Sequence, residues 1–189
     1  MRKIILSEMV SLDGFIAGPD DDLSWHQVDE EFNQYAIELL NSVDTILFGR
    51  LTYQLFENYW PAAALNPSTS KSDLEIAHKI NDMIKIVFSR TLQKVQWKNS
   101  ILIKEIVPHE VQKLKKQHGK DMVIYGSGSI VSAFIRVGLI DDYRIFVNPI
   151  VLGSGKPLFK DIKKRINLSL LNTRTFNNGN VLLRYQPIS

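Results

Sequence analysis

The stretch VIYGSGSIVSAFI, residues 123–135, passes from a strand pattern to a helix pattern through Gly-Ser-Gly-Ser. Val123, Ile124 and Tyr125 are β-branched or aromatic residues typical of a strand, and the apolar residues after Ser129 recur at helical spacing. The small residues between the two patterns have two explanations. Either a tight turn needs them, or another group lies so close to the backbone that side chains would obstruct it.

Strand and helix patterns alternate along the rest of the chain. Strand patterns occupy residues 3–11, 44–49, 84–91, 100–106, 121–126 and 141–153. Helix patterns begin at Asp29, Arg50, about residue 74, Val107 and Ser127. We expect the second helix to stop before Pro61 and residues 61–73 to form a loop, because the residue before a proline avoids the helical conformation. Two β-like runs around NNGN, residues 177–180, predict an antiparallel hairpin.

This alternation predicts an α/β fold in one domain over residues 1–189, with no linker or internal repeat. Helices on both faces of a central, mostly parallel sheet would give three layers, with the antiparallel hairpin at the C-terminus. In such sheets ligands bind outside the carboxyl ends of the strands. The turns at residues 49–53, 89–91 and 126–130 are therefore the candidate binding segments.

Composition excludes several kinds of protein. The 189 residues are 44% hydrophobic and carry a net charge of +3, and they contain no cysteine. Disulfides, thiolate metal sites and a cysteine nucleophile are therefore excluded, which fits a cytoplasmic location. The four histidines show no metal-ligand spacing, so we expect no metal.

Membrane and nucleic-acid partners are not expected. The first 18 residues read as a strand and not as a signal peptide, and no apolar run is long enough to span a membrane. The basic runs at residues 113–120 and 160–165 are interpreted as solvated faces and not as nucleic-acid contacts.

The three candidate turns all suit an anionic ligand. Gly126–Ser129 opens a helix whose N-terminus could hold a pyrophosphate, unless these residues only cap the helix. Arg50 opposes the dipole of its own helix but matches a phosphate, unless it pairs with a carboxylate. Ser89, Arg90 and Thr91 suit a ribose 2′-phosphate, unless they form a simple polar turn. Together the turns point to a nucleotide.

Five motifs now carry a resemblance to a known family. SLDGFIAG (11–18), LFGRLTY (47–53), VFSRT (87–91), VIYGSGSI (123–130) and NPIVLGSGKPLF (148–159) resemble the dihydrofolate reductase-like fold family in content and order. The last motif is similar to the C-terminal reductase domain of the bifunctional riboflavin-biosynthesis deaminase–reductase. The resemblance spans residues 2–185. The chain carries no zinc deaminase signature and would be a stand-alone reductase domain.

The resemblance implies a twisted sheet and an NADPH-dependent oxidoreductase. Arg50 and Thr52 would contact cofactor phosphate, Ser89 and Arg90 would surround the 2′-phosphate, and Ala17 would border the nicotinamide. The full set of implied cofactor-binding residues is Ala17, Gly18, Gly49, Arg50, Thr52, Ser89, Arg90, Thr91, Gly126, Ser127, Gly128, Ser129 and Ile130.

Substrate contacts are implied by the same resemblance. Gly153, Gly155 and Lys156 could meet a phosphorylated ribityl tail, or form a turn with an exposed lysine. Asp13 either lies near the substrate or caps the turn through an Asx bond, and we favour the turn. Trp25, in a polar loop, is the candidate to stack on a flat ring.

The source of the proton is open at this stage. Asp29, Glu30 and Glu31 cluster where the folate enzymes carry a carboxylate, but they read first as charges at a helix start. Asp29 and Glu31 stay weak catalytic candidates. Otherwise the proton would come from water.

The predicted function is reduction of a small conjugated heterocycle by hydride from NADPH. The first substrate candidate is 5-amino-6-(5-phosphoribosylamino)uracil of riboflavin biosynthesis, or a related pyrimidine. A dihydrofolate or pterin reductase and a non-catalytic NADPH-binding module are the alternatives. A homodimer is implied by the resemblance alone.

Overall fold

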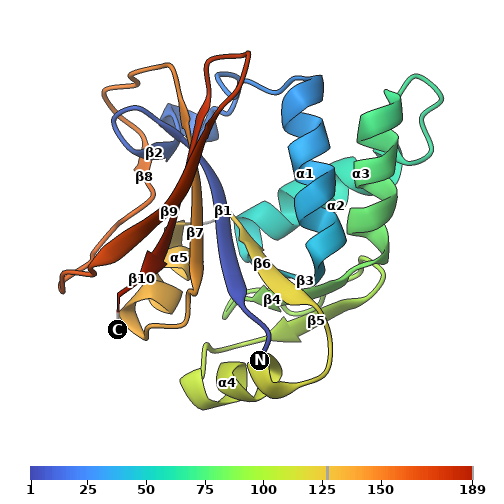
Figure 1. Ribbon diagram of the computed structural model, residues 1–189. Coiled ribbons are helices and arrows are strands. Elements are labelled where there is room, and N and C mark those ends of the chain that lie inside the picture. Colours follow the sequence, from blue (N-terminus) through green and yellow to red (C-terminus); the bar gives the residue numbers. More distant parts are fainter. Residues whose placement is uncertain (127, 189) are drawn as a thin grey trace.

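The computed structural model describes residues 1–126 and 128–188. Ser127, one of the residues expected along the pyrophosphate, therefore lies outside the described residues. An eight-stranded sheet has the order β5-β4-β3-β6-β1-β7-β10-β9 (Figure 1). Its strands are β1 Ile4–Ser11, β3 Val43–Gly49, β4 Ile84–Phe88, β5 Ser100–Ile103, β6 Asp121–Tyr125, β7 Asp142–Asn148, β9 Leu168–Thr175 and β10 Val181–Pro187.

The predicted α/β class is confirmed. The six strands from β5 to β7 are parallel, and β10 pairs antiparallel with β7 on one side and with β9 on the other. The turn between β9 and β10 contains Gly179 at φ 88°, a conformation that glycine adopts without strain. The Asn-Gly signal in the sequence therefore located the hairpin.

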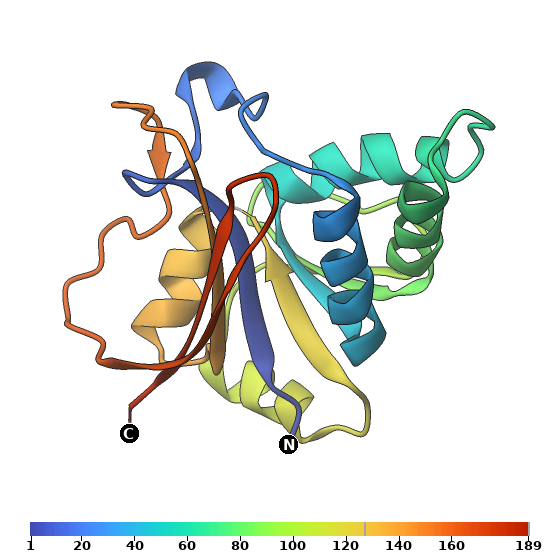
Figure 2. The same cartoon turned by 45° about the horizontal axis from the view of Figure 1, so that its top comes forward.

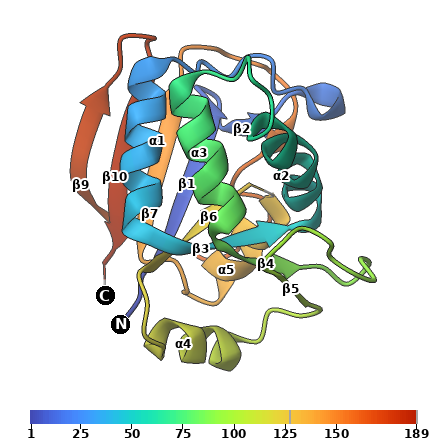
Figure 3. The ribbon, with the colours of Figure 1, turned by 90° about the vertical axis from the view of Figure 1, so that its right-hand side faces the viewer.

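Helices cover both faces of the sheet (Figure 3). The helices α1 Glu30–Ser42, α2 Arg50–Ala63 and α3 Lys71–Asp82 lie on one face, where Ile5 and Ile46 join their apolar side chains. The helices α4 Pro108–Lys116 and α5 Gly128–Arg136 lie on the other, where Ile4 and Leu6 pack against α5. Successive side chains of β1 thus enter different cores because a strand alternates its side chains between faces.

The end of α2 differs from the prediction. The helix continues through Pro61 to Ala63 instead of stopping at Trp60. Pro61 removes one backbone donor, but it lies in the last turn of the helix, where few further bonds depend on it. The Ala64 amide still donates to the Trp60 carbonyl at 3.1 Å, so the helical turn closes across the proline.

Two loops meet beyond the carboxyl ends of β1 and β7. The short strand β2, Phe15–Ala17, pairs with β8, Lys156–Pro157, and the single-turn helix η1, Pro19–Asp21, follows β2. Figure 2 shows the blue segment after β1 and the orange segment after β7 on the same end of the molecule. This pairing places residues far apart in the chain on one rim of the sheet. Over the described residues, the helices are all too short or too polar to cross a membrane.

Candidate active site

A cavity of about 1070 Å³ opens at the carboxyl ends of β1 and β6. Ser7, Glu8 and Met9 of β1 line it, together with residues of α1, α2 and the β2 loop. A groove of about 790 Å³ lies beside it, at the ends of β4 and β5. Leu51 and Arg136 line both hollows, so the two adjoin along the strand ends.

The half of the cavity under α1 and α2 is aromatic. Phe56 stacks on Tyr125 with ring centroids 5.8 Å apart and an interplanar angle of 28°. Trp60 and Phe32 extend this wall. Aromatic walls favour flat rings, because stacking adds to the free energy gained by burying the apolar surface.

Gly126, at the end of β6, packs against α2. Gly126 has φ +63°, and a Cβ on it would lie 2.3 Å from the Thr52 Oγ1 atom. The turn therefore needs glycine for two reasons, a left-handed backbone and a neighbouring side chain at close range. Gly128 begins α5, and its Cβ would approach the Pro157 carbonyl oxygen to 3.1 Å.

The groove is lined by several positively charged side chains. Arg50, Arg90, Lys104 and Arg136 line it together with the single acid Glu105. Such a cluster on one rim attracts a polyanion.

Two of the predicted turns form the walls of this groove. Ser89 is buried, and its hydroxyl oxygen accepts hydrogen bonds from the Thr91 amide at 3.3 Å and the Leu92 amide at 3.1 Å. This turn leaves the Arg90 side chain exposed. Gly49 is the N-cap of α2, and Arg50 extends from the first turn to donate to Gln54 Oε1 at 3.2 Å.

The charged residues expected at the substrate are engaged with other groups of the protein. Lys156 lines the cavity and pairs with Asp21. Asp13 accepts from the Leu152 amide at 3.1 Å and the Gly153 amide at 2.7 Å, so it ties the first loop to the loop after β7. The turn after β1 is itself closed by the Ser11 hydroxyl, which accepts from the Phe15 amide at 3.0 Å, so the predicted Asx bond of Asp13 is replaced by these contacts with the distant loop.

Glycine is required at position 155 by the contact between the same two loops. A Cβ on Gly155 would lie 2.1 Å from the Ala17 carbonyl oxygen, and both residues line the cavity. Gly18 follows Ala17 in the chain. Its amide donates to the Asp22 carbonyl at 2.8 Å and so closes the loop that carries Ala17.

Three other candidates lie away from the cavity lining. Trp25 is buried, and its indole nitrogen donates to the Asp22 carbonyl at 3.0 Å. Asp29 caps α1 by accepting from the Phe32 amide at 2.9 Å. Glu31 accepts from Arg174 and from the Asn177 amide. Trp25 and Asp29 are thus used in local structure, and Glu31 ties α1 to the C-terminal hairpin.

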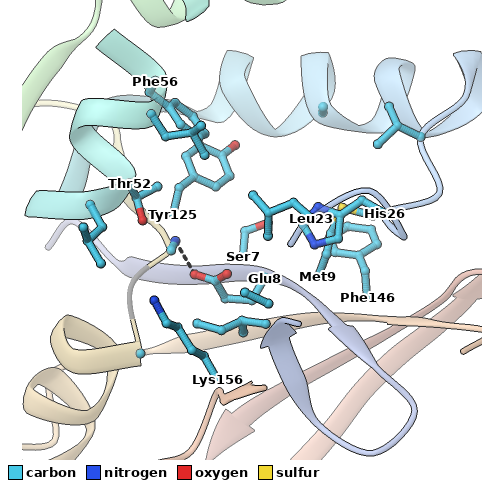
Figure 4. Close-up of a pocket in the computed structure, with 18 of the residues that line it drawn as sticks. Ser7, Glu8, Met9, Leu23, His26, Thr52, Phe56, Tyr125, Phe146 and Lys156 are labelled. Atoms are coloured by element: carbon cyan, nitrogen blue, oxygen red, sulfur yellow. Dashed lines mark hydrogen bonds between the residues drawn. The ribbon is translucent and has the colours of Figure 1, made fainter. Parts of the chain in front are cut away.

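Sequence reasoning missed two residues of the cavity. The Glu8 side chain is buried and accepts from the Gly126 amide, and burial raises the pKa of its carboxyl group to about 8. Burial lowers the pKa of His26, whose Nε2 atom is buried without a hydrogen-bond partner among the described residues. The only signal for Glu8 was a charged residue inside an apolar strand. Figure 4 shows the Glu8 side chain in the cavity that Thr52 and Lys156 also line.

A family model described as the RibD C-terminal domain matches residues 2–182. The chain belongs to the RibD C-terminal domain family. Membership of this RibD C-terminal domain family supports a riboflavin-pathway-like reductase, and hence an oxidoreductase. The resemblance drawn from the five motifs is thereby confirmed.

Individual relatives agree with this family. Uncharacterized protein YyaP of Bacillus subtilis (strain 168) is 42% identical over 184 residues, which are 97% of this chain and 94% of that protein. A putative riboflavin biosynthesis protein from Shewanella sp. PV-4 superposes over 100% of both chains with a TM-score of 0.74 at 22% identity. Dihydrofolate reductase from Enterococcus faecalis gives 0.63 at 13% identity, over 99% of this chain and 97% of that chain. The two solved structures establish the dihydrofolate reductase-like fold.

Proposed function

We propose that this RibD C-terminal domain protein uses NADPH to reduce a flat conjugated heterocycle. The first substrate candidate is 5-amino-6-(5-phosphoribosylamino)uracil or a related pyrimidine. The observation that carries the proposal is that a cationic groove adjoins an aromatic cavity along the strand ends, with lining residues in common. A long ligand with an anionic end and a flat reactive end matches this arrangement.

The groove residues fit the phosphorylated end of the cofactor. Arg90 and Arg50 offer guanidinium groups, which match phosphate oxygens in geometry as well as charge. The first turn of α5 offers backbone N–H groups and a partial positive charge for a pyrophosphate. A Cβ at Gly126 or Gly128 would already meet neighbouring atoms, so the backbone itself forms the surface there.

The cavity side fits the nicotinamide and the substrate ring. Ala17 and Gly155 meet at the mouth of the cavity, on the loops that β2 and β8 hold together. When bound, NADPH supplies the hydride. The chain orients the two rings and keeps water away from them, since apolar side chains form most of the wall under α1 and α2.

The experiment has two parts. Isothermal titration calorimetry should detect NADPH binding that is tighter than NADH binding. Loss of the near-ultraviolet absorbance of NADPH should then follow addition of the phosphoribosylaminouracil, compared with dihydrofolate. Absence of NADPH binding would refute the proposal. Faster turnover of dihydrofolate than of the pyrimidine would show that the substrate is a pterin. NADPH binding without turnover of either compound would show that the protein is a non-catalytic NADPH-binding module.

A further inference from the structure

Glu8 occupies an unusual position on the central strand. Ile4, Leu6 and Val10 point from β1 into the apolar core beneath α5, and Glu8 shares their face because side chains alternate along a strand. At this level the core gives way to the cavity, which Glu8 lines. Only 8% of the Glu8 surface is exposed.

The register of the sheet sets the contact that Glu8 makes. Leu6 pairs with Ile124 across β1 and β6, so Glu8 comes level with Gly126. The Gly126 amide donates to Glu8 Oε1 (Figure 4). This is the turn that begins α5, where the resemblance places the cofactor.

Other carboxyl groups around the cavity lie in different surroundings. Asp21 pairs with Lys156 at the rim, Asp73 accepts from Ser70 at 2.7 Å, and Asp161 is exposed. Among the described residues that line the cavity, Glu8 is the one buried carboxyl group, and it forms no ion pair with any described residue.

Burial explains why the Glu8 proton is held at neutral pH. Loss of hydration disfavours the carboxylate and raises the pKa to about 8, although the Gly126 amide acts in the opposite direction. The titratable groups around Glu8 have different pKa shifts or are paired. Burial raises the pKa of Tyr125 at the end of β6 and lowers that of His26 in the loop before α1. From β8, Lys156 is paired with Asp21, which follows β2.

We propose that Glu8 is the proton donor of the reduction, an inference that rests on the proposed function. The reduced carbon of a C=N or C=O bond gains the hydride supplied by NADPH, which becomes NADP⁺. The π electron pair moves to the nitrogen or oxygen, which takes the Glu8 proton. Glu8 remains as a carboxylate that still accepts from the Gly126 amide, and water returns its proton after the product leaves.

The test compares Glu8→Gln with the matched variant Glu38→Gln, which removes an exposed carboxyl group of α1. In Glu8→Gln the amide oxygen of the new side chain can still accept from Gly126, but that side chain cannot release a proton. We expect kcat to fall about 10²- to 10⁴-fold in Glu8→Gln, as for loss of a general acid, with NADPH affinity little changed. Glu38→Gln should behave as the wild type.

The pH profile separates proton donation from a structural role. Wild-type kcat should fall as pH rises through about 8, because the acid must be protonated. This alkaline limb should disappear in Glu8→Gln. Retention of both the rate and the limb in Glu8→Gln would refute the proposal and leave the proposed reductase function standing.

A measurement without substrate or cofactor completes the test. Carbon-13 NMR of glutamate-labelled protein should show one carboxyl signal that titrates near pH 8 and is absent in Glu8→Gln. A Glu8 signal that titrates at the ordinary value of 4.5 would overturn the inference. If the wild type neither binds NADPH nor turns over, the proposed function fails, and proton donation fails with it whatever the titration shows.

Discussion

Gly126 lies directly against Thr52, since a Cβ at position 126 would stand 2.3 Å from the Thr52 Oγ1 atom. This contact joins the turn before α5 to the first turn of α2. The absence of a side chain in the turn therefore has a structural cause in the protein itself. A cofactor would use a surface that the fold already requires.

Gly126→Ala should separate backbone strain from this contact when compared with Gly138→Ala. Both glycines have positive φ, +63° and +64°, but a Cβ on Gly138 would meet nothing within 4 Å. The left-handed backbone costs an alanine about 1–2 kcal/mol in either variant. Urea unfolding should show a larger loss of stability in Gly126→Ala, and NADPH affinity should fall only there. Equal losses in both would mean that Thr52 moves aside freely.

Arg90→Ala should narrow the preference for NADPH over NADH. Arg90 is exposed on the groove, in a turn that the Ser89 hydroxyl holds in place. A hydrogen bond to a charged group contributes about 1.5–3 kcal/mol, so the dissociation constant for NADPH should rise about 10- to 100-fold while that for NADH stays unchanged. Lys98→Ala, which removes an exposed lysine paired with Asp82, is the calorimetric control. An unchanged ratio of affinities would exclude Arg90 from the 2′-phosphate.

Lys156 and Asp21 should affect a phosphorylated substrate in opposite directions. Because their side chains pair with each other, a substrate phosphate must compete with Asp21 for the lysine. Lys156→Ala should raise KM for the phosphoribosyl substrate several-fold, and Asp21→Asn should lower it. Neither variant should change KM for the dephosphorylated compound. Steady-state kinetics with both compounds would refute this role if the two variants shifted KM alike.

Glu8 should make the protein less stable as pH rises. Its carboxyl pKa is about 8 in the folded chain against 4.5 when solvated, so the folded state binds the extra proton between these values. The free energy of unfolding therefore falls as pH rises through this window, by at most about 1.4 kcal/mol per pH unit. Glu8→Gln should lose this slope and exceed the wild type in stability at neutral pH.

The unfolding free energies of the wild type and Glu8→Gln are best compared between about pH 5 and about pH 8. Asp13 and Glu31 have lowered pKa values, so their contributions are lost only at more acidic pH. Lys85 has its pKa lowered to about 8 by burial, and its effect therefore appears above this window. Burial lowers the pKa of His26, but His26 is common to both proteins. Parallel slopes for wild type and Glu8→Gln would contradict the buried, protonated state.

Much of the fold was predictable because its signals are local. Strand and helix periods alternate along the chain, Asn178-Gly179 turns the final hairpin, and Asp29 caps α1 as its acidic character suggested. The end of α2 was placed wrongly, since a proline in a last turn does not stop a helix, and α3 begins at Lys71 inside the predicted loop. Three strands were predicted too long, because β4, β5 and β7 end at Phe88, Ile103 and Asn148. Parallel strands also bring their carboxyl ends to one edge, which is why three separated turns could be assigned to one rim.

The sequence by itself determined the α/β class, the order of the turns and the family to which the motifs belong. Only the tertiary structure decided which side chains are used in structural contacts, as Asp13, Trp25 and Glu31 are, and which face the cavity. Glu8 shows the reason. A carboxyl group in a strand acquires its pKa and its partner from segments more than a hundred residues away, through burial and register that no local pattern contains.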